Sequence, residues 1–435
     1  MATPDWWPGE EHAAFTDWAL SQGVVANGVT PARFPGRGLG MIATRGIKKG
    51  EALLEVPTSV MLRASDIPSS FTEKFPEDIA VHALLSAFLT HGSPELLSRY
   101  DLWRKAWPSR QDFEESMPIL WPRALGGPQW PDSDEDTTKT TTDSSTHPTT
   151  NFLPPAISGH WNTIPKKQNQ KQYKTDHQNL LSQQETKLRK AWSDVLCVFP
   201  ETDWKTFSYH WLIINTRSFY WVGADEDPPE DRNDAMALLP FADYFNHSDA
   251  ACDVHFSEEG YTFRATKAYK VGEEVFISYG AHPNDFLLAE YGFFLDENSS
   301  DAIYLDDIVF QDIKNHEKQE QLWMNQYYGN YHVTCHGVCY RTEVAACLTY
   351  MNEEDWQNHV LEGSSQGLDE ARSEDTIKIW IRAYRNEADT TMAALRTVID
   401  ASPDVREHRQ KAEMLLRRWA QIRDLCERAL ESVAI

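Results

Sequence analysis

Apolar residues recur three and four positions apart in several parts of the 435-residue chain, and this spacing predicts helices. The first such segment covers residues 10–22 and ends at Gly23, a residue type that commonly follows a helix. From residue 312 onward almost the whole chain has this spacing, with charged residues on the outer positions, which is typical of a helical bundle. Further helices are predicted at residues 79–92, 180–198 and 207–221.

Short apolar runs bounded by turn-forming residues predict strands between these helices. Residues 40–44 and 52–56 form two such runs around a Lys-Gly turn, and residues 275–279 and 302–310 form two more. A pair of short strands is too small to be stable alone, so the first two must join a larger sheet. The pattern therefore predicts an α+β fold, in which a helical insertion at about residues 66–205 separates two groups of strands.

The insertion contains a polar segment. Residues 127–150 are low in hydrophobic residues and rich in Thr, Ser and Asp, and residues 164–178 are polar as well. A segment of this composition buries too little apolar surface to offset the entropy of ordering it. We therefore predict a disordered loop within residues 127–178.

The charge balance is strongly acidic, with 66 acidic against 41 basic side chains and a formal net charge of -25. Such a field repels nucleic acid phosphates, so no nucleic acid partner is expected. A basic partner, such as a lysine-bearing protein segment, fits this field better. The alternative is that the acidity only keeps the protein soluble.

Six cysteines are scattered through a chain that starts without a charged and apolar leader, and no apolar run is long enough to span a bilayer. We therefore expect free thiols, no membrane partner, and a reducing compartment, cytoplasmic, nuclear or both. Cys335 and Cys339 could form half of a zinc site, but no second pair at ligand spacing accompanies them. No metal site is expected.

Polar side chains stand at the ends of buried segments between residues 236 and 294. An apolar run leads into Asp243, Asn246 and His247, and the strand at residues 275–279 ends in Tyr279. Polar groups in such places are often present to bind or react. In isolation the Asn-His pair could equally be a satisfied core pair or an Asx turn.

A glycine-rich stretch near the N-terminus is the second candidate for ligand binding. Gly36, Gly38 and Gly40 only loosely resemble a dinucleotide fingerprint, since no long apolar strand precedes them and no helix follows. A plain β-turn would explain them. Alternatively, the missing side chains let a ligand lie against the bare backbone of Arg37 and Leu39.

The chemistry of the central stretch favours methyl transfer. No Ser or Cys nucleophile with its own base is arranged there, and no set of carboxylates suits magnesium. Methyl transfer from a sulfonium is an in-line displacement that mainly requires alignment and a neutral acceptor nitrogen. Lowering the pKa of a lysine from about 10.4 to about 7 or 8 corresponds to roughly 4 kcal/mol, which an apolar aromatic channel can supply by desolvation. The Tyr279 hydroxyl could hold the polarised methyl group through weak C–H to oxygen contacts.

Five motifs together resemble the SET-domain methyltransferases, specifically the class with a split SET domain typified by the Rubisco large-subunit lysine methyltransferase and the actin-histidine methyltransferase. The motifs are GRGLGMIATRGIKKGEALLEVP, RSFYW, LLPFADYFNHS, VFISYG and NDFLLAEYGFF, in the family's order. The resemblance implies a SET β-fold with a knot-like crossing over about residues 1–300, in parts at about 24–65 and 206–300. It also implies an all-α, substrate-binding-like domain at residues 301–435.

The resemblance also assigns roles to residues. Tyr279 matches the catalytic tyrosine. S-adenosylmethionine is expected to contact Arg37, Gly38, Leu39, Asn246, His247 and Phe293, and substrate to contact Arg217, Asp243 and Tyr291. Position 221 is Trp where the plant enzyme's motif has a basic residue, so that substrate contact is not carried over. The zinc-binding cysteine-rich tail of histone-directed enzymes is missing, which weakens a histone-tail assignment.

These observations predict a monomeric protein N-methyltransferase that uses S-adenosylmethionine and acts on lysine of a non-histone protein. Histidine remains an alternative acceptor, since the same architecture serves both. A third alternative is a SET-like scaffold protein without catalysis. A degenerate site would be expected to have lost at least one of Tyr279, Asn246 and His247, and all three are present.

Overall fold

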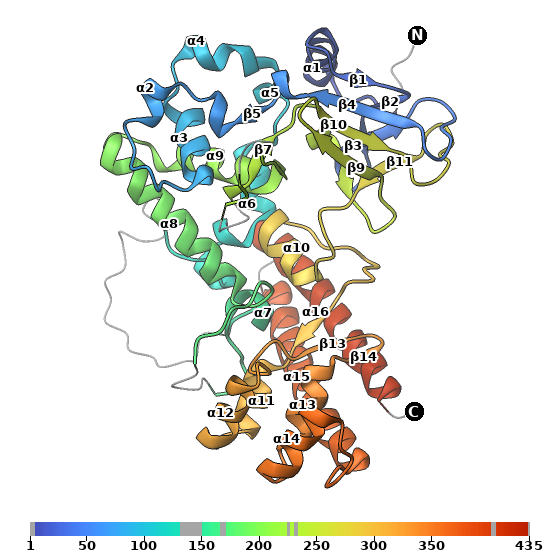
Figure 1. Ribbon diagram of the computed structural model, residues 1–435. Coiled ribbons are helices and arrows are strands. Elements are labelled where there is room, and N and C mark those ends of the chain that lie inside the picture. The colour runs from blue at the N-terminus through green and yellow to red at the C-terminus, as the bar shows by residue number, and fades with distance from the viewer. Residues whose placement is uncertain are drawn as a thin grey trace. The chain divides into compact units, whose positions relative to one another are not determined.

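The computed structural model describes residues 5–130, 150–165, 171–223, 227–229, 234–401 and 406–433 (Figure 1). Contacts within the chain divide it into two units, each built from two stretches. The first unit comprises Met1–Phe113 and Thr186–Ala281, and the second comprises Glu114–Glu185 and His282–Ile435. The expected end of the SET domain at about residue 300 stays a prediction.

The described residues of the first unit contain three small sheets. One has the order β1-β4-β10-β9, the second β2-β3-β11-β8, and the third β5-β7-β6. In the second sheet β11 pairs antiparallel with β3 but parallel with β8, so strands from both ends of this unit's sequence meet. The strand bounds are β1 Val25–Ala26, β2 Val29–Phe34, β3 Gly38–Ala43, β4 Ala52–Pro57, β5 Leu62–Arg63, β6 Ser218–Tyr220, β7 Met236–Leu238, β8 Asn246–His247, β9 Asp253–Ser257, β10 Gly260–Arg264 and β11 Glu274–Ile277.

The predicted strands at residues 40–44 and 52–56 are confirmed as β3 and β4. The strand β2 was not predicted, because Pro31 interrupts its pattern. Pro31 is tolerated there since β2 lies at the edge of its sheet, where a missing N–H need not face a partner. The turn between β2 and β3 places Gly36 and Gly38 at φ values of 74° and 73°, a region that favours glycine.

Within the first unit, helices pack against one another. The predicted first helix is confirmed as α1 Glu10–Ser21, whose Phe15 ring stacks on Trp103 of α5. The His82 ring of α3 stacks on Trp211 of α9 at 4.3 Å between centroids. The helices of the insertion are α2 Ser69–Thr72, α3 Val81–His91, α4 Pro94–Leu97, α5 Asp101–Lys105, α6 Arg110–Ser116, α7 Pro155–Ser158 and α8 Leu180–Val198, and α9 Trp204–Arg217 follows it. The 3-10 turns of the described residues are η1 Thr58–Val60, η2 Ala64–Asp66, η3 Ser98–Tyr100, η4 Pro118–Leu120, η5 Arg123–Leu125 and η7 Ala242–Tyr244.

The predicted helix at residues 207–221 was wrong at its C-terminal end. The helix α9 begins after Asp203, whose carboxylate accepts from the Thr206 N–H, and ends at Arg217. Residues Ser218–Tyr220 instead form β6, which pairs antiparallel with β7. Sheet pairing therefore overrides the helical spacing and leaves Arg217 at the helix end.

The second unit confirms the predicted helical C-terminal region. Its long helices α15 and α16 run side by side (Figure 1) and bury Trp380, Tyr384 and Trp419. The region is not all-α, because it also carries the three-stranded sheet β12-β13-β14. The bounds are α10 Asn284–Tyr291, β12 Ile303–Tyr304, α11 Asp306–Asp312, α12 His316–Met324, β13 His332–Thr334, β14 Gly337–Val338, α13 Tyr340–Leu348, α14 Glu353–Glu362, α15 Glu370–Ala401 and α16 Arg406–Ser432.

The strand predicted at residues 302–310 was wrong for most of its length. Only Ile303–Tyr304 pair as a strand, and a helix begins at Asp306. Asp306 and Asp307 lie in the first helical turn, where carboxylates are favourable. The apolar run that suggested a strand, residues 308–310, is instead the buried face of α11.

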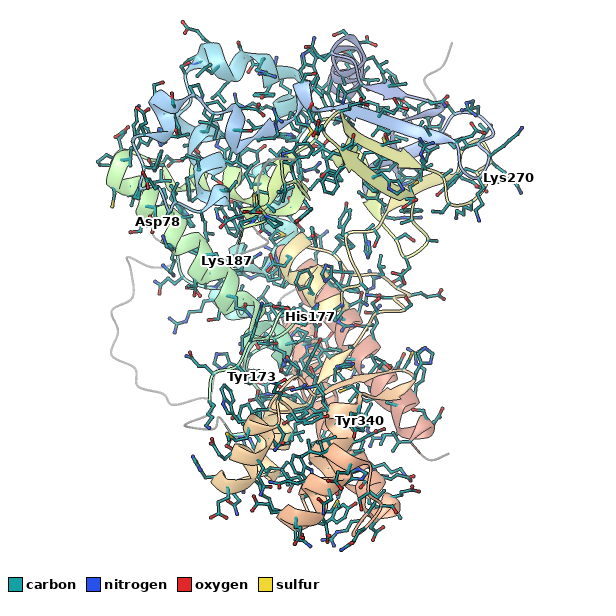
Figure 2. The ribbon with its side chains drawn as sticks, viewed as in Figure 1. Asp78, Tyr173, His177, Lys187, Lys270 and Tyr340 are labelled. Carbon is teal, nitrogen blue, oxygen red and sulfur yellow. The ribbon has the colours of Figure 1, made fainter. Side chains whose placement is uncertain are left out.

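The disordered loop predicted at residues 127–178 was wrong for its described parts, while residues 131–149 and 166–170 lie outside the described residues. Phe152, Leu153 and Ile157 are buried. The Tyr173 hydroxyl (labelled in Figure 2) donates to Asp306 at 2.6 Å. Residues 162 and 163 donate their N–H groups to the buried Glu387 carboxylate. Buried carboxylates that need donors therefore order a segment that appears polar in sequence.

Candidate functional site

The parallel pair β8 and β11 brings Asn246, His247 and Tyr279 together in the first unit. Asn246 lies beside Phe276 in the pairing, so the residues that follow β11 pass next to β8. The Tyr279 N–H donates to His247 Nδ1 at 3.0 Å, and the two rings stack with centroids 5.2 Å apart. Burial lowers the pKa of His247, which favours the neutral ring as an acceptor.

The Tyr279 hydroxyl is oriented by a main-chain carbonyl. It donates to the Phe245 oxygen at 2.6 Å. Burial raises the pKa of Tyr279 to about 12, so the phenol keeps its proton at neutral pH. Because a hydroxyl has one proton and two lone pairs, a proton committed to Phe245 directs the lone pairs elsewhere as acceptors.

A carboxylate links the glycine-rich strand to this pair. Asn246 Nδ2 donates to the Leu39 carbonyl at 2.9 Å and to Glu274 Oε1 at 2.8 Å. Glu274 also accepts from Arg37 at 2.8 Å, and its side chain is 6% exposed against 62% for Arg37. Burial raises the pKa of Glu274, and the bonds from Asn246 and Arg37 oppose that shift. Glu274, which sequence reasoning missed, therefore links Arg37 to Asn246, and Asn246 bonds Leu39 directly; all three were predicted to contact the cofactor.

Gly40 permits the close approach of β3 and β8. A Cβ atom at this position would lie 2.7 Å from Asn246 Nδ2 and 2.7 Å from Glu274 Oε1. A Cβ at Gly38 would meet no atom within 4 Å. The backbone at Gly38 is thus bare and has room beside it, while Gly40 is required by packing.

Arg217 and Asp243 form a second, more buried cluster. Arg217 Nη1 donates to the Asp243 carbonyl at 2.8 Å and to its carboxylate at 3.3 Å. The Trp103 indole N–H donates to the same carboxylate oxygen, Oδ2, at 3.0 Å. Burial raises the pKa of Asp243, whose side chain is 3% exposed, and the Arg217 charge opposes the shift. Asp243 lies two residues before Phe245, whose carbonyl accepts from the Tyr279 hydroxyl, and this places the cluster at the candidate site.

Two further predicted site residues belong to the second unit. Tyr291 ends α10 and Phe293 follows it, with ring centroids 6.3 Å apart. Between them Gly292 adopts a left-handed conformation that ends the helix. Their proposed contacts with cofactor and substrate stay predictions. Trp221, outside the cluster, lies under the Arg63 guanidinium at 5.7 Å.

Sequence reasoning missed Glu274, Trp103 and the Phe245 carbonyl. Glu274 had a usable signal, since a carboxylate that begins a partly buried strand favours a hydrogen-bonding or charged partner. Trp103 lies in a tryptophan-rich stretch of the insertion, 140 positions from the residue it contacts, and nothing local indicates that bond.

Within the described residues, no group of three or more His, Cys, Asp and Glu side chains is placed to hold a metal ion. Across the same residues, no helix combines the length and the apolar character needed to cross a membrane. All six cysteines are free thiols.

The chain is similar to curated proteins, one of which carries a name that refers to lysine methylation. It is 33% identical over 149 residues to the ribosomal lysine N-methyltransferase set11 of Schizosaccharomyces pombe, which covers 34% of this chain and 37% of that protein. It is 24% identical over 317 residues to SET domain-containing protein 4 of Homo sapiens, covering 69% of this chain and 62% of that protein. The matches thus span less than two thirds of these relatives.

Solved structures of Rubisco LSMT share the fold. The structure bound to AdoMet superposes with a TM-score of 0.57 at 15% identity, over 98% of this chain and 93% of the other. The structure bound to sinefungin and monomethyllysine gives a TM-score of 0.58 at 14% identity, over 98% and 92%. These matches confirm the predicted fold class.

The family model of the SET domain matches residues 38–280, which include β3, β8, β11 and Tyr279. This match covers more than half of the chain, and the chain therefore belongs to the SET domain family.

Proposed function

We propose that this chain is an S-adenosylmethionine-dependent protein N-methyltransferase that methylates lysine side chains of a non-histone protein. The observation that carries the proposal is the Tyr279 hydroxyl, oriented by Phe245 and adjoining His247. The named activity of set11 and the ligands of the Rubisco LSMT structures support it.

The residues present fit the cofactor. S-adenosylmethionine carries a carboxylate, an ammonium group and a sulfonium, and when bound it supplies a methyl group for displacement. Gly38 offers bare backbone with open space beside it. Arg37 and Glu274 offer one charge of each sign beside Asn246. We propose that Arg37, Gly38, Leu39, Asn246 and His247 hold the cofactor, together with Phe293.

The other site residues would act on the acceptor. Because the Tyr279 hydroxyl donates its proton to the Phe245 carbonyl, its lone pairs would accept weak C–H···O hydrogen bonds from the transferring methyl group. Asp243 Oδ1 is buried and has no hydrogen-bond partner among the described residues, so it suits a donor such as the substrate amine. Arg217 limits the negative charge there and so reduces the tendency of Asp243 to keep that amine protonated. We assign substrate contact to Arg217, Asp243 and Tyr291.

We also propose a basic protein segment as the partner, because the chain carries a net charge of -25. Ribosomal proteins are the first candidates, given the name of set11. We propose that the protein acts as a monomer in the cytoplasm, the nucleus or both.

His247→Ala is expected to weaken S-adenosylmethionine binding by about tenfold, since it removes the acceptor for the Tyr279 N–H and the ring beneath Tyr279. Isothermal titration measures the change. His255→Ala is the matched control, because His255 is exposed on the edge strand β9. Equal affinities for the two variants would remove His247 from the binding site.

Gly40→Ala is expected to weaken cofactor binding by about ten- to hundredfold, because overpacking must displace Asn246 or Glu274. Gly46→Ala is the control, since its new Cβ would meet nothing within 4 Å. Titration of both variants measures the effect. An unchanged affinity for Gly40→Ala would show that the Asn246 position does not govern binding.

The proposal as a whole is tested with tritiated S-adenosylmethionine and a lysate from cells that lack the protein. Transfer of label to protein is the expected result. Absence of both transfer and measurable cofactor binding would favour a scaffold without catalysis.

A further inference from the structure

A side chain of the helical insertion reaches the candidate site. Trp103 lies on α5, is 1% exposed, and donates its indole N–H to Asp243 at 3.0 Å. Asp243 lies in the turn η7, two residues before the Phe245 carbonyl that accepts from Tyr279. A contact from the insertion therefore bears on the short segment that orients the Tyr279 hydroxyl.

The turn that contains Asp243 is held in an uncommon conformation. Phe241, directly before η7, has a φ of 73°, a region that side chains other than glycine rarely adopt. It is fully buried and packs against Phe15, whose ring also stacks on Trp103. Such a conformation persists only where the surroundings determine it strongly, and Trp103 is part of those surroundings.

Two donors from different elements hold Asp243. Arg217, at the end of α9, bonds both its carbonyl and its carboxylate. Trp103 bonds the carboxylate oxygen that Arg217 also contacts. With Oδ2 fixed by these donors, the orientation of the remaining oxygen and of the following residues depends on both.

We propose that Trp103 is a positioning residue for methyl transfer: its indole N–H fixes the Asp243 carboxylate and, through the turn, the Phe245 carbonyl that orients Tyr279. This inference rests on the proposed function. The helical insertion between the two halves of the SET domain is then part of the catalytic framework.

The test compares Trp103→Phe with Trp107→Phe. The Trp107 indole N–H is buried and has no hydrogen-bond partner among the described residues, and its ring packs edge-on against Trp103. Both changes remove similar ring volume, but only the first removes a hydrogen bond. We expect kcat to fall about tenfold for Trp103→Phe, the effect of losing one hydrogen bond to a charged group, with cofactor affinity within about twofold of wild type. Trp107→Phe is expected to change kcat by less than about twofold.

A pH profile separates positioning from packing. Asp243 faces Arg217 from α9, Tyr244 from its own turn, Tyr279 after β11 and, behind Tyr244, His12 from α1. Donation from Trp103 stabilises the ionised carboxylate and lowers its pKa. Loss of the Trp103 hydrogen bond raises the pKa of Asp243. As the pH is lowered, the Trp103→Phe protein is therefore expected to lose activity at a higher pH than the wild type does. If Trp103 had a purely structural role, the acid limb of the pH–activity profile would not move.

Three outcomes decide the matter. The proposal stands if only Trp103→Phe lowers kcat and moves the acid limb upward. Equal kcat values and pH profiles for the two variants, with an active wild type, would overturn it while leaving the proposed function intact. No transfer by the wild-type protein would overturn the proposed function itself. Should Trp103→Phe fail to fold, 3-benzothienylalanine at position 103 keeps the bicyclic shape, lacks only the N–H and is judged by the same two criteria.

Discussion

Replacing Tyr279 by phenylalanine is expected to reduce methyl transfer by about 100-fold or more, which is typical for removing one preorganised polar group from a reaction centre. The change deletes only the hydroxyl that Phe245 orients at 2.6 Å. The ring that stacks on His247 and the N–H bond to His247 both remain. Cofactor affinity is therefore expected to stay within about twofold of wild type.

Single-turnover kinetics and isothermal titration measure the two quantities separately. Tyr269→Phe is the control, because Tyr269 is buried in the same unit and, among the described residues, its hydroxyl makes only a long contact, 3.8 Å, with Cys252. A Tyr279→Phe protein that turns over as fast as this control would show that the hydroxyl takes no part in the reaction.

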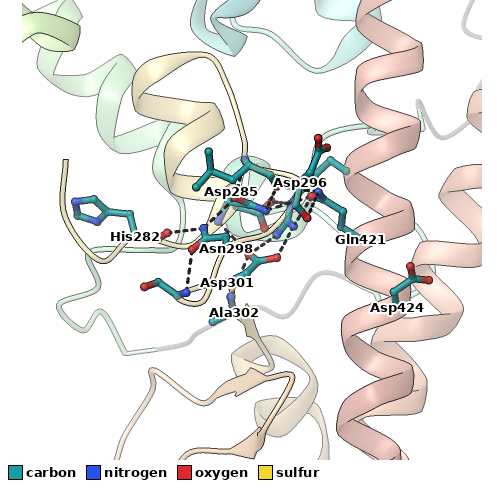
Figure 3. A network of polar contacts seen from close by, with 12 residues as sticks. His282, Asp285, Asp296, Asn298, Asp301, Ala302, Gln421 and Asp424 are labelled. Carbon is teal, nitrogen blue, oxygen red and sulfur yellow. Dashed lines mark hydrogen bonds and ion pairs between the residues drawn. The ribbon is translucent and has the colours of Figure 1, made fainter. Parts of the chain in front are cut away.

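Arg418→Met is expected to destabilise the second unit by about 3–5 kcal/mol, the usual cost of breaking a buried ion pair by removing one partner. Arg418 is fully buried on α16 and binds Asp285 at 2.8 Å and Asp301 at 2.7 Å (Figure 3). Burial already raises the pKa of Asp285, and the Arg418 charge is what opposes this. Without it, buried carboxyl groups of α10 and the loop after it must be protonated or exposed.

The matched control is the neighbouring Arg417→Met. Arg417 pairs with Asp296 at the same 2.8 Å, but both side chains are largely exposed, at 66% and 84%. Exposed pairs contribute little, so its unfolding midpoint is expected to remain close to that of wild type. Urea unfolding followed by tryptophan fluorescence compares the two. If both variants are equally stable, the buried network does not hold α16 to α10.

The local sequence pattern was sufficient to predict an element where the spacing of its apolar residues agrees with the helix or strand that forms. The helices α1 and α8 and the strands β3 and β4 could all be predicted from residue spacing. Prediction from the local pattern failed where contacts with residues distant in sequence determine the structure. Residues 218–220 pair with β7 as a strand instead of continuing the preceding helix. The polar residues around Tyr173 are ordered by buried carboxylates from elsewhere in the chain.

The candidate site divides in the same way. The adjacency of Asn246 and His247 with Tyr279 could be inferred from the family resemblance. Asn246 and His247 form β8, Tyr279 follows β11, and these two strands pair. Glu274 and Trp103 were missed because their roles depend on hydrogen bonds across the fold to Asn246 and Asp243. The spacing of residues in the sequence does not predict a hydrogen bond to a distant main-chain carbonyl such as that of Phe245.

The central claim is that this site transfers a methyl group to lysine. The most direct measurement is to label a ribosomal protein fraction with isotopic S-adenosylmethionine and to identify the modified residue by mass spectrometry. We expect labelled methyl-lysine with the wild-type protein and almost none with Tyr279→Phe. Label on histidine alone, or equal label with the Tyr279→Phe protein, would contradict the account.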